Sequence, residues 1–171
     1  MTYASFLDLI DLFFVKEFLD RGFSLQHIRR ALDEARFYLG SPHFARSIFF
    51  TNGSEIFLKM PKNGFMISLL KSGQYAINQV VELLNEKIDF EKLTGLGYAE
   101  RWYPMGKQGG VVIDPRVSFG RPTLVGRGVA TQNIYDLFLG ENKQIEPVSA
   151  WFDIPNREIL NAVVFEQRLC A

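Results

Sequence analysis

The chain has 171 residues, of which 47% are apolar and sixteen are Phe, and its nineteen basic side chains balance nineteen acidic ones. This balance excludes a strong overall field that would attract nucleic acid or a membrane surface. The single cysteine, Cys170, excludes a disulfide framework within the chain, and no apolar run reaches the roughly 18 residues of a transmembrane helix. We therefore expect a cytoplasmic protein of one or two small domains.

The first forty residues predict a helical hairpin. The first helix is expected over residues 5–21 with Gly22 at its end, and Ser24 is placed to cap a second helix that Gly40 ends. Apolar residues cover most of the circumference of the first helix, whereas a surface helix normally carries one apolar stripe. This helix is therefore expected to be buried on several sides or to face a second copy of the chain, which favours a homodimer.

The middle of the chain predicts a small antiparallel meander followed by a helix. Residues 48–51 and 54–60 flank Asn52-Gly53, a pair that suits a two-residue hairpin turn, and a third run follows over residues 65–70. From about Gln74 to Lys87 the apolar period becomes helical. The predicted order here is hairpin, third strand and helix.

The C-terminal third predicts a strand, a shaped loop and three helices. A strand is expected over residues 111–113, and the loop from Asp114 to Val129 contains three glycines, two prolines and three arginines. Helices follow over 131–139, capped by Thr131, and over 145–152 and 156–169, where a tight turn between the last two resembles a helix-turn-helix. The predicted fold class is α+β and mainly helical, with domains at 1–113 and 114–171.

The strongest local charge bias lies between residues 101 and 127. This stretch contains a single acidic residue, Asp114, and aromatic residues are interleaved with its basic ones. The basic residues are Arg101, Lys107, Arg116, Arg121 and Arg127. Guanidinium groups here either bind an acidic protein or nucleic acid, or brace the loop by bonding its backbone carbonyls.

The last helix offers a second set of candidates. Arg157, Asn161 and Arg168 are the residues that a helix-turn-helix would direct at DNA. Because glutamates on the same helix cancel its arginines, packing or dimerisation is the competing interpretation.

Enzyme signatures are weak in this sequence. No nucleophile–histidine–carboxylate set, metal-ligand cluster or phosphate loop can be assembled, and the two histidines, His27 and His43, fit a solvated helix and a surface loop. We expect a protein that is not an enzyme and has no metal or cofactor.

Several segments carry a family resemblance. They are, in chain order, Ser5-Phe6-Leu7-Asp8-Leu9, Gly22-Phe23-Ser24-Leu25-Gln26-His27-Ile28-Arg29, the hairpin over 49–57, Pro115-Arg116, Gly120-Arg121-Pro122, Gly126-Arg127-Gly128 and the tail over 131–166. Together they resemble the VapB-type antitoxins that join a MerR-like region to a short helix-turn-helix-like C-terminal domain. In that family the third glycine motif is usually Gly-Thr-Arg, so Arg127 is shifted by one position.

The resemblance implies an antitoxin of a type II toxin-antitoxin system. Such a protein binds a PIN-like ribonuclease toxin at its acidic, metal-dependent active site and binds operator DNA as a dimer to repress its own operon. Family members begin with a MerR-like helix-turn-helix, and the resemblance places the start of this chain where the third helix of that module would begin. DNA binding is thus expected either from this chain alone or with that module added.

An alternative function is a MerR-like transcriptional regulator. In that interpretation the meander and the Phe-rich middle form a pocket for a small apolar ligand.

Overall fold

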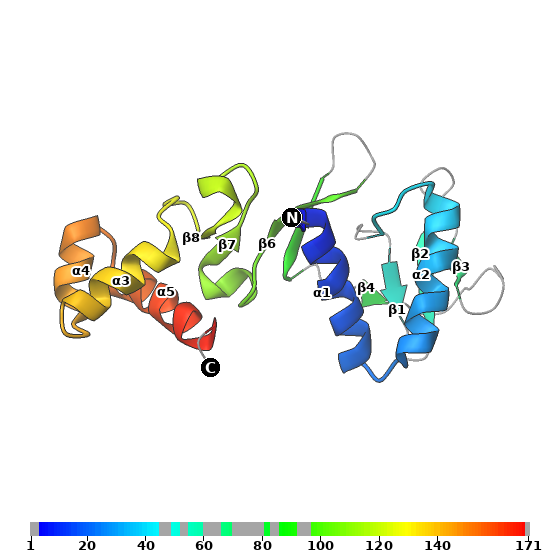
Figure 1. Cartoon of the computed structure of the whole chain (residues 1–171), viewed down its shortest axis with the longest axis horizontal. Helices are drawn as coiled ribbons and strands as arrows, with labels where there is room; N and C mark the ends of the chain where they lie inside the picture. The colour runs from blue at the N-terminus through cyan, green and yellow to red at the C-terminus, as the bar shows by residue number, and fades with distance from the viewer. Residues whose placement is uncertain are drawn as a thin grey trace. The chain divides into compact units, whose positions relative to one another are not determined.

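The computed structural model describes residues 4–44, 49–51, 55–59, 66–69, 81–82, 86–91 and 97–169. Within these ranges, five helices and two small antiparallel sheets give the mainly helical α+β fold that the sequence predicts (Figure 1). The chain divides into unit 1, Met1–Asn85 with Phe90–Ala99, and unit 2, Glu86–Asp89 with Glu100–Ala171.

The helices are α1 (Phe6–Asp20), α2 (Leu25–Leu39), α3 (Thr131–Gly140), α4 (Ile145–Phe152) and α5 (Asn156–Leu169). The strands are β1 (Phe49–Thr51), β2 (Ile56–Lys59), β3 (Met66–Ser68), β4 (Val81–Glu82), β5 (Ile88–Phe90), β6 (Ala99–Trp102), β7 (Val111–Ile113) and β8 (Pro122–Leu124). Two 3₁₀ turns, η1 (Lys107–Gly109) and η2 (Ser118–Gly120), flank β7. No helix in the described part of the chain has the length and apolar content to cross a membrane.

The predicted helical hairpin of unit 1 is confirmed, and Figure 1 shows α1 and α2 joined by a short connection. Ser5 caps α1 in a reciprocal arrangement: its hydroxyl accepts the Asp8 backbone N–H at 3.1 Å, and the Asp8 carboxylate accepts the Ser5 N–H at 2.8 Å. Ser24 caps α2 by accepting the His27 N–H, and Gly40 ends it with a left-handed φ of 60°. Local residue choice therefore sets both helix starts.

The burial of α1 is one-sided. Ile10, Phe14 and Phe18 are fully buried, and the Phe14 ring lies edge-on to Phe49 of β1 at 5.9 Å between centroids. Leu12, in contrast, is 65% exposed. Several of the apolar residues around α1 are thus exposed and not covered by the described part of unit 1.

The sheet of unit 1 has the strand order β3-β2-β1-β4, which confirms the antiparallel meander. The register pairs Thr51 of β1 with Ile56 of β2. One local prediction was wrong. Val81–Glu82 forms β4 and pairs with β1, so the helix predicted over 74–87 does not extend through it; the sheet edge offered by β1 overrides the helical period there.

Some sequence predictions fall on residues outside the described ranges. They are the Asn52-Gly53 turn itself, the turn after β2, the first part of the predicted 74–87 helix, and Cys170.

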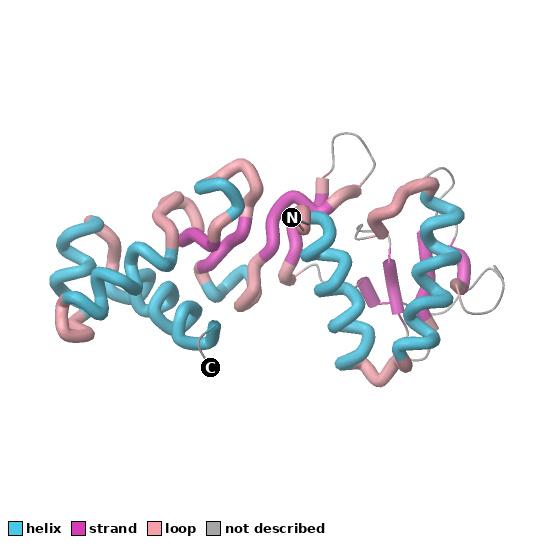
Figure 2. The backbone as a smooth tube through the Cα atoms, viewed as in Figure 1, coloured by secondary structure: helices cyan, strands magenta, loops and turns pink. Residues whose placement is uncertain are grey.

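The sheet of unit 2 has the order β5-β6-β7-β8, drawn in magenta in Figure 2. The register joins Val111 to Leu124 and Ile113 to Pro122. Because β7 pairs with β8, residues 111–113 belong with the C-terminal helices. The chain passes between the two units at 85/86, 89/90 and 99/100, whereas the sequence predicts a single boundary at 113/114.

The core of unit 2 packs α3, α4 and α5 against β7 and β8. Its fully buried centre is formed by Val111, Leu124, Ile134, Val148, Ile159 and Ala162. All three helices occur where the sequence predicts them, but Thr131 does not cap α3. Ala130 occupies the cap position, and the Thr131 hydroxyl instead contacts the Pro122 carbonyl oxygen and the Glu166 carboxylate of α5.

Candidate partner-binding surface

A buried carboxylate organises the start of the loop from residue 114 to residue 129. Asp114 is 3% exposed and accepts hydrogen bonds from Arg101 Nε at 2.9 Å, from the Arg116 backbone N–H at 2.9 Å, and from Arg116 Nε and Nη2 at 3.0 Å each. The bonds from the Arg116 side chain are the main cause that holds the pKa of Asp114 well below its usual range, against the opposing effect of burial. Arg101 and Arg116 therefore brace the loop, through a carboxylate and not through the backbone carbonyls considered above.

Lys107 likewise forms an ion pair with a carboxylate of its own chain. Its Nζ lies 2.8 Å from Asp89 Oδ1, and the Tyr103 hydroxyl donates to Asp89 Oδ2 at 2.7 Å. Burial raises the pKa of Asp89, but the hydrogen bonds from Lys107 and Tyr103 outweigh it and leave the pKa below its usual value. Lys107 is thus tied to unit 2's own β-sheet.

Arg127 connects the loop to α5. Its Nε and Nη2 lie 3.0 Å and 3.2 Å from the two carboxylate oxygens of Glu158, a bidentate pair. This pair holds the pKa of Glu158 below its usual value. Arg127, the arginine displaced by one position from the Gly-Thr-Arg motif, therefore links the loop to α5.

Arg121 differs from its neighbours. It is exposed and forms no ion pair with another residue in the described ranges. Asp89, Glu100 and Glu158, which lie outside the 101–127 window, balance the other cations in space. Of the five cations between residues 101 and 127, Arg121 is consequently the one without an ion pair to a described residue.

The loop next to Arg121 has an unusual backbone. Ser118, Phe119 and Gly120 are three successive residues with positive φ, of 47°, 57° and 75°. The Phe119 side chain is fully exposed, at 102%. Sequence reasoning missed this pair of features, because neither Ser nor Phe signals a left-handed conformation.

The predicted helix-turn-helix residues separate into two groups. Arg157 and Arg168 are exposed on α5, without an ion pair among the described residues. Asn161 instead packs toward the start of β7, where a Cβ on Gly110 would meet its Nδ2 at 2.6 Å. Asn161 is half-buried and lies on the side of α5 that packs against the sheet.

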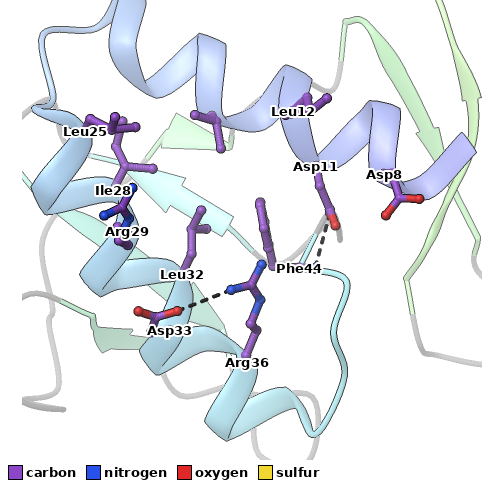
Figure 3. A pocket seen from close by; sticks show the side chains of 11 residues that line it. Asp8, Asp11, Leu12, Leu25, Ile28, Arg29, Leu32, Asp33, Arg36 and Phe44 are labelled. Atoms are coloured by element: carbon purple, nitrogen blue, oxygen red, sulfur yellow. Dashed lines mark hydrogen bonds and ion pairs between the residues drawn. The ribbon is translucent and has the colours of Figure 1, made fainter. Parts of the chain in front are cut away.

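Unit 1 contains a pocket of about 420 Å³ between α1 and α2 (Figure 3). Apolar residues of the two helices form its floor, with charged side chains at the rim; the lining is Asp8, Asp11, Leu12, Val15, Leu25, Ile28, Arg29, Leu32, Asp33, Arg36 and Phe44. The Arg36 guanidinium lies 5.4 Å from the centre of the Phe44 ring and pairs with Asp33. The pocket thus lies on the helical hairpin, whereas the alternative interpretation expected it in the meander.

One end of this pocket brings together the side chains of Asp8, Asp11 and His43. Their potential metal-ligand atoms lie within 4.8 Å of one another. His43 Nδ1 is 3.0 Å from Asp11 Oδ2, and Asp11 Oδ1 accepts the Phe44 N–H at 3.3 Å. We assign no metal to this cluster, because these bonds account for its geometry as a tether between α1 and the segment after α2. His43 was predicted to be a surface loop residue and is instead half-buried in this tether.

The fold and these contacts define a two-unit α+β protein with a braced, arginine-bearing loop before a trihelical end. Its fold is similar to that of Rv2018 from Mycobacterium tuberculosis, whose crystal structure superposes with a TM-score of 0.64 over 94% of this chain and 78% of that one. The two sequences are 21% identical, so this likeness shows the fold alone. No family model matches the chain, and no curated protein matches it.

Proposed function

We propose that this protein is the antitoxin of a type II toxin-antitoxin system. It acts in the cytoplasm, is not an enzyme, neutralises a PIN-like ribonuclease by direct binding, and takes part as a homodimer in DNA-binding autoregulation of its operon. The observation that carries the proposal is the exposed Arg121 guanidinium, which has no ion pair with any described residue, on a loop that three neighbouring arginines brace.

The chemistry of Arg121 suits a nuclease active site. Such a site gathers carboxylates around a divalent ion, and a guanidinium pairs with a carboxylate through two parallel hydrogen bonds. A lysine would supply a point charge without that fork. Arg116 and Arg127 would first have to leave Asp114 and Glu158, so Arg121 is the arginine that reaches an acidic partner at the least cost.

Co-expression with the PIN-like nuclease encoded beside it tests the proposal. The full chain should co-elute with the nuclease in size exclusion and suppress its ribonuclease activity. Replacing Arg121→Ala should weaken binding by about 2–5 kcal/mol, mostly through faster dissociation. Arg157→Ala, which removes another exposed and unpaired arginine, is the matched control. Failure of the wild-type chain to co-elute contradicts the antitoxin function, whereas unchanged binding by Arg121→Ala contradicts the assignment of Arg121.

The DNA-binding part of the proposal rests on α5. Arg157, Leu160, Val164 and Arg168 follow one another at three- and four-residue steps and share one face. Two phosphate contacts from this face would give a salt slope of about −1.8 for duplex DNA. A gel shift on the upstream duplex, with Arg157 and Arg168 both replaced by Ala, measures that contribution. An unchanged shift would place DNA binding elsewhere.

The pocket in unit 1 favours a second candidate function, a MerR-like regulator that responds to a small ligand. Its apolar floor and volume suit a small apolar molecule. Titration with an apolar fluorophore such as anilinonaphthalene sulfonate, on the wild type and on Leu32→Asp, tests it. Saturable binding that the substitution abolishes supports this candidate, and absence of saturable binding excludes it.

A further inference from the structure

The backbone at Phe119 is held in a conformation that phenylalanine rarely adopts. Bulky side chains are outliers in the left-handed region, because Cβ approaches the following carbonyl oxygen. Burial of the ring would offset that cost, but Phe119 is fully exposed. A strained residue whose side chain is left in solvent is a candidate for a function outside its own chain.

The surrounding contacts keep this loop in place. Ser118 Oγ donates to the Gly128 carbonyl oxygen at 3.0 Å, and the Arg121 N–H donates to the Ser118 carbonyl oxygen at 3.1 Å. The Gly120 N–H adds a bond to Val117 O at 3.0 Å. The Arg116 clamp on Asp114 fixes the start of the segment, and pairing of β8 with β7 fixes its end. Phe119 is thus presented by a rigid platform.

We propose that Phe119 is the aromatic anchor of the toxin interface. In this arrangement the Phe119 ring enters an apolar pocket of the toxin, beside the acidic site that Arg121 engages. This inference rests on the antitoxin function proposed above. Aromatic and arginine side chains dominate the binding energy of protein interfaces, particularly when they are presented in the bound conformation. The occupant is a protein and not a nucleic acid, because Arg121 is the one cation of the segment without an ion pair to a described residue, and phosphate binding needs several.

The test measures the dissociation constant of the full chain with the PIN-like nuclease encoded beside it. Phe119→Ala should weaken binding by about 30-fold or more. Phe119→Tyr should stay within a few-fold of the wild type, because it keeps the ring. Phe119→Gly should lose binding while raising the thermal midpoint, since glycine adopts positive φ freely. Phe37→Ala, at an 81% exposed phenylalanine of α2, is the control and should bind as the wild type does.

Three outcomes overturn the inference. If the wild type binds and Phe119→Ala binds within threefold of it, the anchor is wrong while the antitoxin function stands. If the wild type forms no complex, the function proposed above is wrong and the anchor with it. If Phe119→Ala instead lowers binding of a single-stranded RNA or of the upstream duplex, the ring is a base-stacking platform and not a protein anchor. Circular dichroism on each variant verifies folding.

Discussion

At the scale of single residues, Asp114 decides which arginines are available to a partner. Two guanidinium groups and a backbone N–H converge on this carboxylate, so Arg101 and Arg116 serve the loop itself. Arg121, five positions after Arg116, is left exposed. The same residue type therefore has two roles within one short segment.

Replacing Asp114→Asn should destabilise unit 2 by about 2 kcal/mol at pH 7, since hydrogen bonds to charged groups contribute roughly 1.5–3 kcal/mol. The pKa of Asp114 is lower in the folded state than in the unfolded state, so its contribution is present above about pH 4. That contribution is lost as the pH falls from there toward the folded-state pKa. Urea unfolding at pH 7 and at pH 3 should show the difference between variant and wild type shrinking at the lower pH.

At the scale of elements, the contact between α3 and α5 depends on a polar pair in the core. The Thr131 hydroxyl donates to Glu166, and both residues are buried. Sequence reasoning placed Thr131 at a helix start correctly but assigned its hydroxyl to capping. The hydrogen bond of that hydroxyl could not be predicted from the sequence, because its acceptor, Glu166, lies 35 positions along the chain.

Thr131→Val removes the donor and leaves a buried carboxylate without it, and we expect a loss of about 1–3 kcal/mol of unfolding free energy. Thr131→Ser keeps the hydroxyl and should retain most of that stability. Chemical denaturation of both variants measures the difference. Equal stability of the Val and Ser variants would show that the hydroxyl contributes nothing.

The close approach of α5 to β7 requires a glycine. Gly110 has a φ of +72°, and an added Cβ would lie 2.6 Å from Asn161 Nδ2. Gly110→Ala should therefore lower the thermal midpoint. Gly140→Ala, at the end of α3 with open space around it, should leave stability unchanged or raise it by up to ~1 kcal/mol. A smaller loss at Gly110 than at Gly140 would contradict this packing.

At the scale of the whole molecule, the exposed apolar side chains of α1 favour a homodimer. Leu9, Leu12 and Leu19 all lie on the uncovered part of the helix. Burying such a face against a second copy would remove it from water. Light scattering should report a dimer for the wild type and a monomer for Leu12→Lys, with Leu139→Lys on α3 as an exposed-leucine control. A monomeric wild type would contradict the homodimer.

The sequence by itself determined the helices with local signals and the mixed fold class. Ser5, Ser24 and Gly40 act on backbone groups within a few positions, so their caps were readable. The period of apolar residues likewise located α3, α4 and α5 before any contact between them was known.

Tertiary structure alone decided the strand at Val81–Glu82, the boundary between the units and the roles of the arginines. Each depends on a contact that no local signal specifies: β4 pairs with β1, β7 pairs with β8, and Arg127 pairs with Glu158, 31 positions away. The net charge of a segment counts only the side chains within it, whereas a binding partner also meets the charged side chains that folding places next to that segment. Among the described residues, folding brings carboxylates to each of these cations except Arg121, which follows the exposed Phe119 by two positions.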